Sequence, residues 1–176
     1  MQVESVVDVA PKPEPVSTSL SETQVKLIQR TWSSMESLGA EKAGVLLFLN
    51  IFEAAPGLAK LFSFGRVRGF DPKGDLSRNA ALVAHARSVV CTMSRAVSML
   101  DDMPKLAMLL YDLGEIHARF GVKEEHYPIV GAAFLKTLET GLGNKYTPEV
   151  RAAYVCMWEV IVQSMLEVKA DSDNGK

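Results

Sequence analysis

Apolar residues recur with a helical period along most of the chain between residues 21 and 168. In one long stretch they follow one another at alternating steps of four and three, namely Leu82, Ala86, Val89, Met93, Ala96 and Leu100. Residues at this spacing share one face of an α-helix, whereas a half-buried strand would show strict alternation. No stretch shows convincing alternation bounded by turn residues. The pattern therefore predicts an all-α domain.

Capping and breaking residues divide this pattern into separate helices. Ser21 and Gln24 have the spacing of a capping box, which predicts a helix from residue 21 with Val25, Ile28, Trp32 and Met35 on its apolar face. A second helix is expected from about Glu41, with Val45, Phe48, Leu49 and Phe52 as its apolar face, and it must stop before Pro56. The remaining expectations are a short turn over 57–62, a mobile glycine-rich loop over 63–73, and helices over about 75–100, 104–120, 124–141 and 148–168.

The two ends differ in composition from this helical region. Residues 1–19 include three prolines within five positions, Pro11, Pro13 and Pro15, and this is typical of an extended, solvated arm. Residues 170–176 are polar and are expected to form a frayed tail. The predicted domain organisation is therefore a flexible arm over 1–19, one globular domain over 20–169 and a flexible tail over 170–176.

Composition narrows the class of protein. The chain has 176 residues, 48% of them hydrophobic and 23% charged, which is ordinary for one soluble domain. A formal net charge of −2 gives no reason to expect nucleic acid or an anionic membrane as a partner, and no apolar run reaches transmembrane length. Cys91 and Cys156 lie in apolar helical patterns, which favours buried, reduced thiols in a cytoplasmic protein.

Two of the three histidines lie within apolar stripes. His85 falls between Leu82 and Val89, and His117 follows Leu113. A lone histidine in such a stripe is more often a satisfied core residue, but two on neighbouring helices could share one slot. No HxxxH, HExxH or CxxC spacing supports a metal site made of protein ligands alone. A haem needs only axial ligands from the protein, so the pair favours a haem. The third histidine, His126, stands among charges and is interpreted as a surface or pocket-edge residue.

Several runs of residues jointly resemble the globin family over about 21–168. These are Leu46 to Pro56, the run Leu61-Phe62-Ser63-Phe64, the stretch Leu113 to Val122, and the start of the last helix at Thr147 to Tyr154. The resemblance implies a three-over-three helical sandwich around a haem b. It makes His117 the proximal iron ligand and His85 the distal residue that contacts iron or bound gas. The haem contacts that it implies are Phe48, Phe62, Phe64, Val89, Leu113, Val122 and Tyr127.

Within the family, the chain is similar to neuroglobin-like animal globins and to non-symbiotic plant haemoglobins. In both groups the distal histidine commonly binds iron when no gas is present, which implies a six-coordinate resting state here. As proximal ligand, His117 needs its second nitrogen held, and we expect the Leu113 carbonyl to accept its N–H. Ser88 stands where neuroglobins carry a lysine that reaches a haem propionate, which leaves Arg66, Arg68 and Arg87 as candidate partners.

The resemblance implies reversible binding of dioxygen, nitric oxide and carbon monoxide, for storage, transport or sensing. The alternative is a redox enzyme, a nitric oxide dioxygenase or nitrite reductase, that depends on an external reductase. A third class is a helical interaction domain that shares the fold without haem, as light-harvesting biliproteins do, with Cys91 as a bilin attachment site. The two histidines favour the haem-containing alternatives.

Overall fold

The computed structural model describes residues 19–173, with side chains placed as far as residue 167. These residues form the helices α1 (Glu22–Ser37), α2 (Ala40–Ala54), α3 (Ala80–Ser98), α4 (Met103–Arg119), α5 (Tyr127–Leu142) and α6 (Pro148–Asp173). Short 3₁₀ turns connect them, namely η1 (Pro56–Leu61), η2 (Phe64–Arg66), η3 (Leu76–Arg78), η4 (Glu124–His126) and η5 (Gly143–Lys145). No described residue belongs to a strand, so the predicted all-α class is confirmed.

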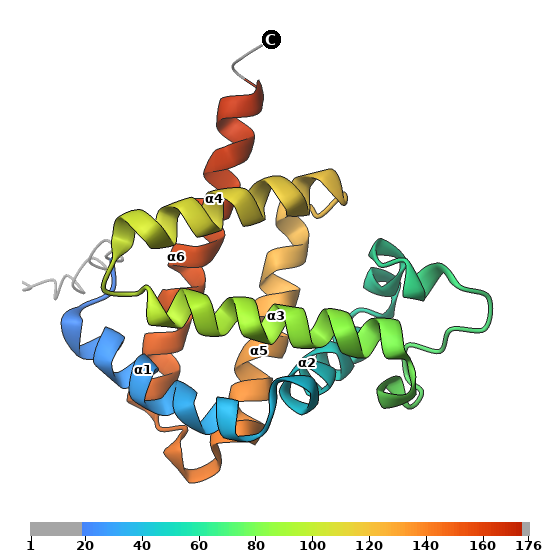
Figure 1. The fold of residues 1–176 in the computed structure, drawn as a ribbon, viewed down its shortest axis with the longest axis horizontal. Helices are drawn as coiled ribbons and strands as arrows, with labels where there is room; N and C mark the ends of the chain where they lie inside the picture. Colours follow the sequence, from blue (N-terminus) through green and yellow to red (C-terminus); the bar gives the residue numbers. More distant parts are fainter. Residues whose placement is uncertain (1–18, 174–176) are drawn as a thin grey trace, which may run out of the picture.

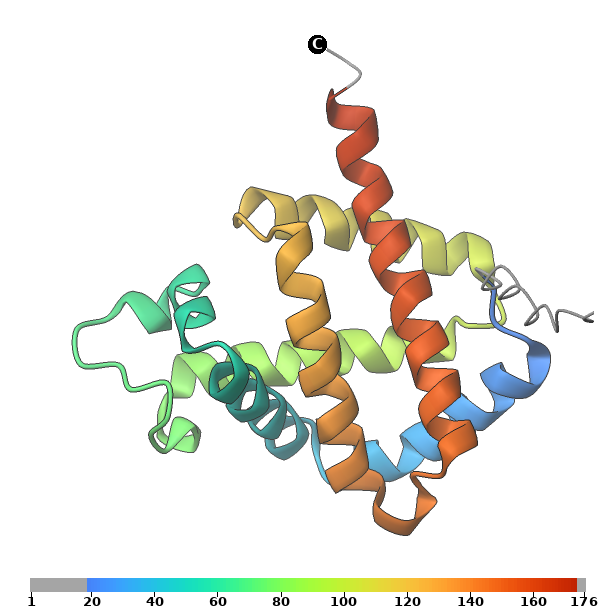
Figure 2. The ribbon, with the colours of Figure 1, turned by 180° about the vertical axis from the view of Figure 1, so that it is seen from behind.

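The helices form two layers that cross each other (Figures 1 and 2). Helices α1, α3 and α4 make the front layer in Figure 1, and α2, α5 and α6 lie behind it. Helix α3 packs chiefly on α2, whereas α4 packs chiefly on α6. The predicted three-over-three sandwich is confirmed. In its front layer, α3 and α4 are neighbours, and each packs on a different helix of the layer behind. None of the described helices combines the length and the apolarity that crossing a bilayer requires.

The predicted start of α1 is confirmed in atomic detail. Ser21 Oγ accepts from the Gln24 backbone N–H at 3.2 Å, and Gln24 Oε1 accepts from the Ser21 backbone N–H at 2.9 Å. This reciprocal pair satisfies two N–H groups that have no partner inside the helix. All four residues predicted for its apolar face, Val25, Ile28, Trp32 and Met35, are buried.

Helix α3 begins later than the expected position near residue 75. Asn79 Oδ1 accepts from the Leu82 backbone N–H at 3.0 Å and caps the helix, which therefore begins at Ala80. Asp75 caps the separate turn η3 instead. At the other end of the chain, α6 continues to Asp173 rather than ending near Val168.

Two expectations about individual side chains in these helices are wrong. Leu49 was expected on the apolar face of α2, but it is exposed, and Leu47 and Ile51 are buried beside Phe48 and Phe52. The buried face is displaced because α2 packs on both α3 and α5. Cys91, expected in the core, is also exposed. The buried stripe of α3 runs through Leu82, Ala86 and Val90 and leaves Cys91 on the opposite side.

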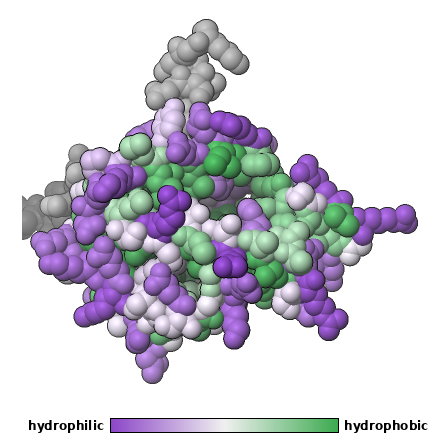
Figure 3. All heavy atoms as spheres, in the orientation of Figure 1, coloured by the Kyte–Doolittle hydropathy of each residue, from purple (hydrophilic) through white to green (hydrophobic). Residues whose placement is uncertain are grey.

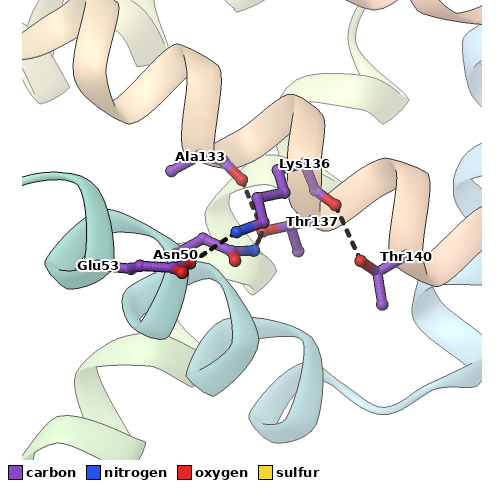
Figure 4. Close-up of polar contacts among 6 residues, drawn as sticks. All are labelled: Asn50, Glu53, Ala133, Lys136, Thr137 and Thr140. Carbon is purple, nitrogen blue, oxygen red and sulfur yellow. Dashed lines mark hydrogen bonds and ion pairs between the residues drawn. The ribbon is translucent and has the colours of Figure 1, made fainter. Parts of the chain in front are cut away.

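Polar contacts fix α2 against α5 (Figure 4). Asn50 Nδ2 donates to Thr137 Oγ1 at 2.9 Å, and Thr137 Oγ1 in turn donates to the Ala133 carbonyl at 2.8 Å. Both polar side chains are buried, so each would cost free energy without its partner. At the surface, Lys136 lies 2.6 Å from Glu53, and this contact lowers the pKa of the Glu53 carboxyl. These contacts hold the helix that carries Phe48 and Phe52.

Gly44 allows α2 and α3 to approach closely. A Cβ atom at Gly44 would lie 2.4 Å from the Ala86 carbonyl oxygen and 2.6 Å from its carbon. Both of these are backbone atoms, so a side-chain rotation cannot relieve the contact. The close approach of α2 and α3 therefore depends on glycine at position 44. It also sets the position of the part of α3 that carries His85.

The change Gly44→Ala is expected to lower the free energy of unfolding by about 1–3 kcal/mol, the usual cost of overpacking a core. Gly57→Ala is the matched control, because a Cβ at Gly57 meets no heavy atom within 4 Å. Urea unfolding followed by circular dichroism compares the two variants with the wild type. Equal unfolding midpoints for the two variants would show that the helix contact tolerates a methyl group.

Candidate functional site

His85 lies on α3 and its ring is surrounded on one side by phenylalanine rings. The centroid of the His85 ring is 5.5 Å from that of Phe48, 5.2 Å from that of Phe62 and 6.2 Å from that of Phe64. The residue as a whole is exposed. Three of the predicted contact residues therefore meet at the predicted distal histidine.

The phenylalanines also contact one another. Phe62 and Phe64 are stacked with ring centroids 5.1 Å apart and an interplanar angle of 7°, and Phe48 meets Phe62 edge-on at 5.3 Å. Phe48 and Phe64 are buried, and Phe62 is half-buried. These rings form an apolar wall beside His85 that offers no hydrogen-bond partner to a polar ligand.

This environment lowers the pKa of His85. Burial against the apolar wall is the main cause, and the charge of His117 is the second. His85 is therefore a neutral imidazole at neutral pH, with a nitrogen lone pair available to a metal ion.

His117 is held in one orientation by its own helix. Its Nδ1 lies 2.7 Å from the Leu113 carbonyl oxygen. A carbonyl only accepts, so Nδ1 carries a proton, and in the neutral form of the ring Nε2 is the nitrogen with the lone pair. This is the arrangement expected for a metal-binding histidine, and the predicted role of the Leu113 carbonyl is confirmed. The helix ends just after this residue, where Gly121 adopts a φ of +78° and the Val122 N–H donates to the His117 carbonyl at 3.0 Å.

The remaining predicted contact residues lie at the edge of the core. Val89, Leu113 and Val122 are half-buried and pack against it. Tyr127 is buried at the start of α5, and this burial raises the pKa of its hydroxyl. Figure 3 shows apolar surface beside α4 and between α4 and α3 on this face of the molecule.

Two exposed apolar residues flank His117 near the end of α4, and the sequence pattern did not single them out as exposed. Ile116 is 47% exposed and Phe120 is 66% exposed, and they stand one residue before and three residues after His117. Large apolar side chains exposed beside a histidine mark a surface that a ligand can cover. In the sequence they stand next to charged residues, with Glu115 before Ile116 and Arg119 before Phe120, and this neighbourhood was the available signal of exposure.

Other residues considered from the sequence have different surroundings. His126 accepts from the Lys123 backbone N–H at 3.0 Å through Nδ1 and so stabilises the turn η4. Of the three arginines proposed as propionate partners, Arg87 lies 3.8 Å from Glu41. Arg66 and Arg68 are exposed, and no ion pair involves them among the described residues.

His85 and His117 are the residues that would hold a planar metal cofactor in this site. His85 and His117 come from two helices that pack on different partners, and each offers a lone pair. A metal bound between two imidazoles needs further ligands, and a porphyrin provides four nitrogens in one plane. The phenylalanine wall and the apolar residues of α4 suit the flat, apolar body of a porphyrin.

Comparison with known proteins agrees with this geometry. The family model described as Globin matches residues 45–165. The chain is 34% identical over 148 residues to neuroglobin of Danio rerio, covering 83% of this chain and 90% of that protein. It is 32% identical over 156 residues to anaerobic nitrite reductase HBII of Casuarina glauca, covering 86% of this chain and 94% of that protein.

The fold is similar to that of a solved structure described as a hexacoordinated heme protein from an anhydrobiotic tardigrade at pH 4. The TM-score is 0.75 at 20% sequence identity, and the match covers 85% of this chain and 94% of that chain. This similarity concerns the fold, whereas the neuroglobin relative and the family model concern the sequence. The family model and the neuroglobin relative establish that the chain belongs to the globin family and is a haem-binding protein.

Proposed function

We propose that this chain is a gas-binding globin with haem b, in which His117 is the fixed iron ligand and His85 an exchangeable sixth ligand. The globin domain spans 20–169 in this proposal, and haem is held without covalent attachment because the sequence contains no CxxCH motif. When bound, haem supplies an iron that takes diatomic gases. The observation that carries the proposal is the pair of imidazoles on α3 and α4, of which His117 is bonded to the Leu113 carbonyl and His85 is packed against the phenylalanine wall.

His117 and His85 have different support, and this favours different roles. The hydrogen bond to Leu113 fixes the ring of His117, so its Nε2 points in one direction. His85 has no such bond among the described residues and is held only by ring contacts with three phenylalanines. A histidine held by ring contacts alone can turn away from a metal without losing a hydrogen bond. His85 is therefore suited to exchange, and His117 is suited to permanent ligation.

The visible spectrum of the reduced, deoxygenated protein tests this assignment. The wild type is expected to show the sharp, split bands of six-coordinate ferrous haem. His85→Ala is expected to show one broad band, because only His117 then remains as an axial ligand. Val89→Ala is the matched control, since it shortens an apolar residue one turn along α3 without removing an imidazole.

A single broad band in the wild type would contradict exchangeable ligation by His85 and would favour an open iron site for simple gas storage or transport. Split bands retained in His85→Ala would place the sixth ligand elsewhere. Dioxygen, nitric oxide and carbon monoxide are the proposed ligands, and storage, transport or sensing is the proposed role.

A second candidate function is reduction of nitrite, which the relative named as an anaerobic nitrite reductase favours. This reaction consumes one electron and two protons for each nitrite that becomes nitric oxide and water. The electron must come from an external reductase, and the two protons must come from solvent. Anaerobic nitrite consumption with dithionite as electron source tests this function. Turnover no faster than that of free haem would exclude it.

A further inference from the structure

The segment between α2 and α3 forms one end of the molecule and contains an open groove. It is the part at the right of Figure 1 that carries the turns η1, η2 and η3. The groove has a volume of about 410 Å³, within the range of small-molecule sites. Phe64, Val67, Phe70 and Ala81 give it an apolar lining, and Arg68 contributes a charged group.

Arg68 is a cation without a neutralising partner. Its side chain is exposed, and no carboxylate among the described residues forms an ion pair with it. The two acidic residues of the same loop are engaged locally, since Asp75 pairs with Arg78 at 3.0 Å and Asp71 accepts from the Lys73 backbone N–H at 2.9 Å. The guanidinium therefore remains available to an anion from outside the chain.

The surrounding segment is basic although the chain is acidic overall. Residues 60–95 contain seven lysines and arginines but only two aspartates and no glutamate, a net charge of +5 in a chain with a net charge of −2. Val67 is 63% exposed within this basic segment. Figure 3 shows hydrophilic side chains projecting around apolar surface at this end. Positive potential around an apolar groove selects a ligand that is both apolar and anionic.

We propose that this groove binds an anionic amphiphile, an alkyl chain that ends in a carboxylate. The alkyl chain lies against Phe64, Val67 and Phe70, and the carboxylate accepts hydrogen bonds from the Arg68 guanidinium. Both parts are needed, because an exposed guanidinium alone binds a carboxylate weakly in water. Burying the alkyl chain supplies the remaining affinity.

The groove is connected to His85 through two rings. Phe64 lines the groove and stacks on Phe62, and the ring of Phe62 lies 5.2 Å from that of His85. A ligand that displaces Phe64 therefore changes the contacts that hold the His85 ring. This coupling rests on the proposed exchange of His85 at the iron, whereas binding in the groove does not.

Calorimetric titration of the haem-loaded protein with decanoate, below its micelle concentration, tests the site. We expect saturable one-site binding to the wild type and at least about tenfold weaker binding to Arg68→Gln, because a charge-assisted hydrogen bond is lost. Ala81→Leu fills the groove from α3 and is expected to weaken binding similarly. Lys42→Gln removes an exposed, unpaired cation from α2 and is expected to bind decanoate as the wild type does.

Several results would overturn the proposal. One is equal affinity of the wild type and Arg68→Gln, and another is equal affinity for decylammonium, which has the same alkyl chain and the opposite charge. Absence of decanoate binding would also overturn it. This holds if a haem propionate occupies Arg68, and it holds if the basic face binds vesicles of anionic phospholipid instead.

The coupling has its own measurement. Decanoate is expected to change the proportion of six-coordinate haem in the reduced spectrum. By linkage, carbon monoxide must then change the dissociation constant of decanoate. Identical dissociation constants with and without carbon monoxide would overturn the coupling. If the wild-type iron proves five-coordinate, the proposed role of His85 fails, but the calorimetric comparison still decides whether the groove binds the amphiphile.

Discussion

Replacing His117 by glycine is expected to abolish stable haem binding. Of the two histidines of the site, His117 is the one whose orientation is fixed by a hydrogen bond, from Nδ1 to the Leu113 carbonyl at 2.7 Å. Loss of a residue that merely orients a metal ligand costs about 10–100-fold in affinity, so loss of the ligand itself should cost more than about a hundredfold. His85 cannot compensate, because it is held only by ring contacts. Haem content, measured as the ratio of Soret to protein absorbance in purified protein, provides the test.

Two further measurements separate ligation from folding. His126→Asn is the matched control, because asparagine keeps an acceptor for the Lys123 N–H and removes a histidine from outside the site. This variant is expected to retain haem as the wild type does. Added imidazole is expected to restore haem binding to His117→Gly by occupying the vacated space. Full haem content in His117→Gly without imidazole would show that another residue is the proximal ligand.

The helices could be predicted from the sequence because their signals are local. The capping box at Ser21 and Gln24 involves neighbouring residues, as does the glycine that ends α4 at Gly121. The start of α3 was misplaced because Asp75 and Asn79 are both good capping residues, and an apolar period runs past both. Competition between two adjacent caps is decided by how the loop packs.

The exposure of Leu49 and Cys91 could not be predicted in the same way. Periodicity gives the direction of an apolar stripe, but its width depends on which helices cross it. Helix α2 is covered by both α3 and α5, and this selects Leu47 and Ile51 for burial instead of Leu49. The prediction that Cys91 lies in the core was wrong for the same reason, because the width of the buried stripe of α3 also depends on the helices that cross it.

The histidine pair was visible in the sequence, whereas the groove beside it was not. His85 and His117 are conspicuous because titratable groups are rare in apolar stripes. The groove depends on the path of the segment from Phe62 to Asn79. This path includes a close approach of Gly65 to Ala59, where a Cβ atom would lie 1.9 Å from the Ala59 carbonyl oxygen. In the sequence, this contact is visible only as a glycine six residues after Ala59.

The affinity of reduced protein for carbon monoxide is expected to rise about ten- to a hundredfold in His85→Leu. While His85 occupies the iron, a gas binds only the fraction of molecules from which it has detached, so the apparent affinity is multiplied by that fraction. Leucine removes the competing nitrogen and keeps an apolar side chain against Phe48 and Phe62. Equilibrium titration and flash photolysis measure the affinity and the two rate constants.

Comparison of two gases tests whether His85 also acts as a hydrogen-bond donor. Bound carbon monoxide is a weak hydrogen-bond acceptor. The rise in its affinity in His85→Leu therefore reports only that His85 no longer competes for the iron. Dioxygen should gain less, because His85→Leu also removes an N–H donor that is worth about 1.5–3 kcal/mol to a charge-bearing acceptor. Ser88→Ala, an exposed position on the same helix, is the control and is expected to leave both affinities unchanged. An unchanged carbon monoxide affinity in His85→Leu would mean that His85 does not compete for the iron, and equal gains for the two gases would mean that it donates no hydrogen bond.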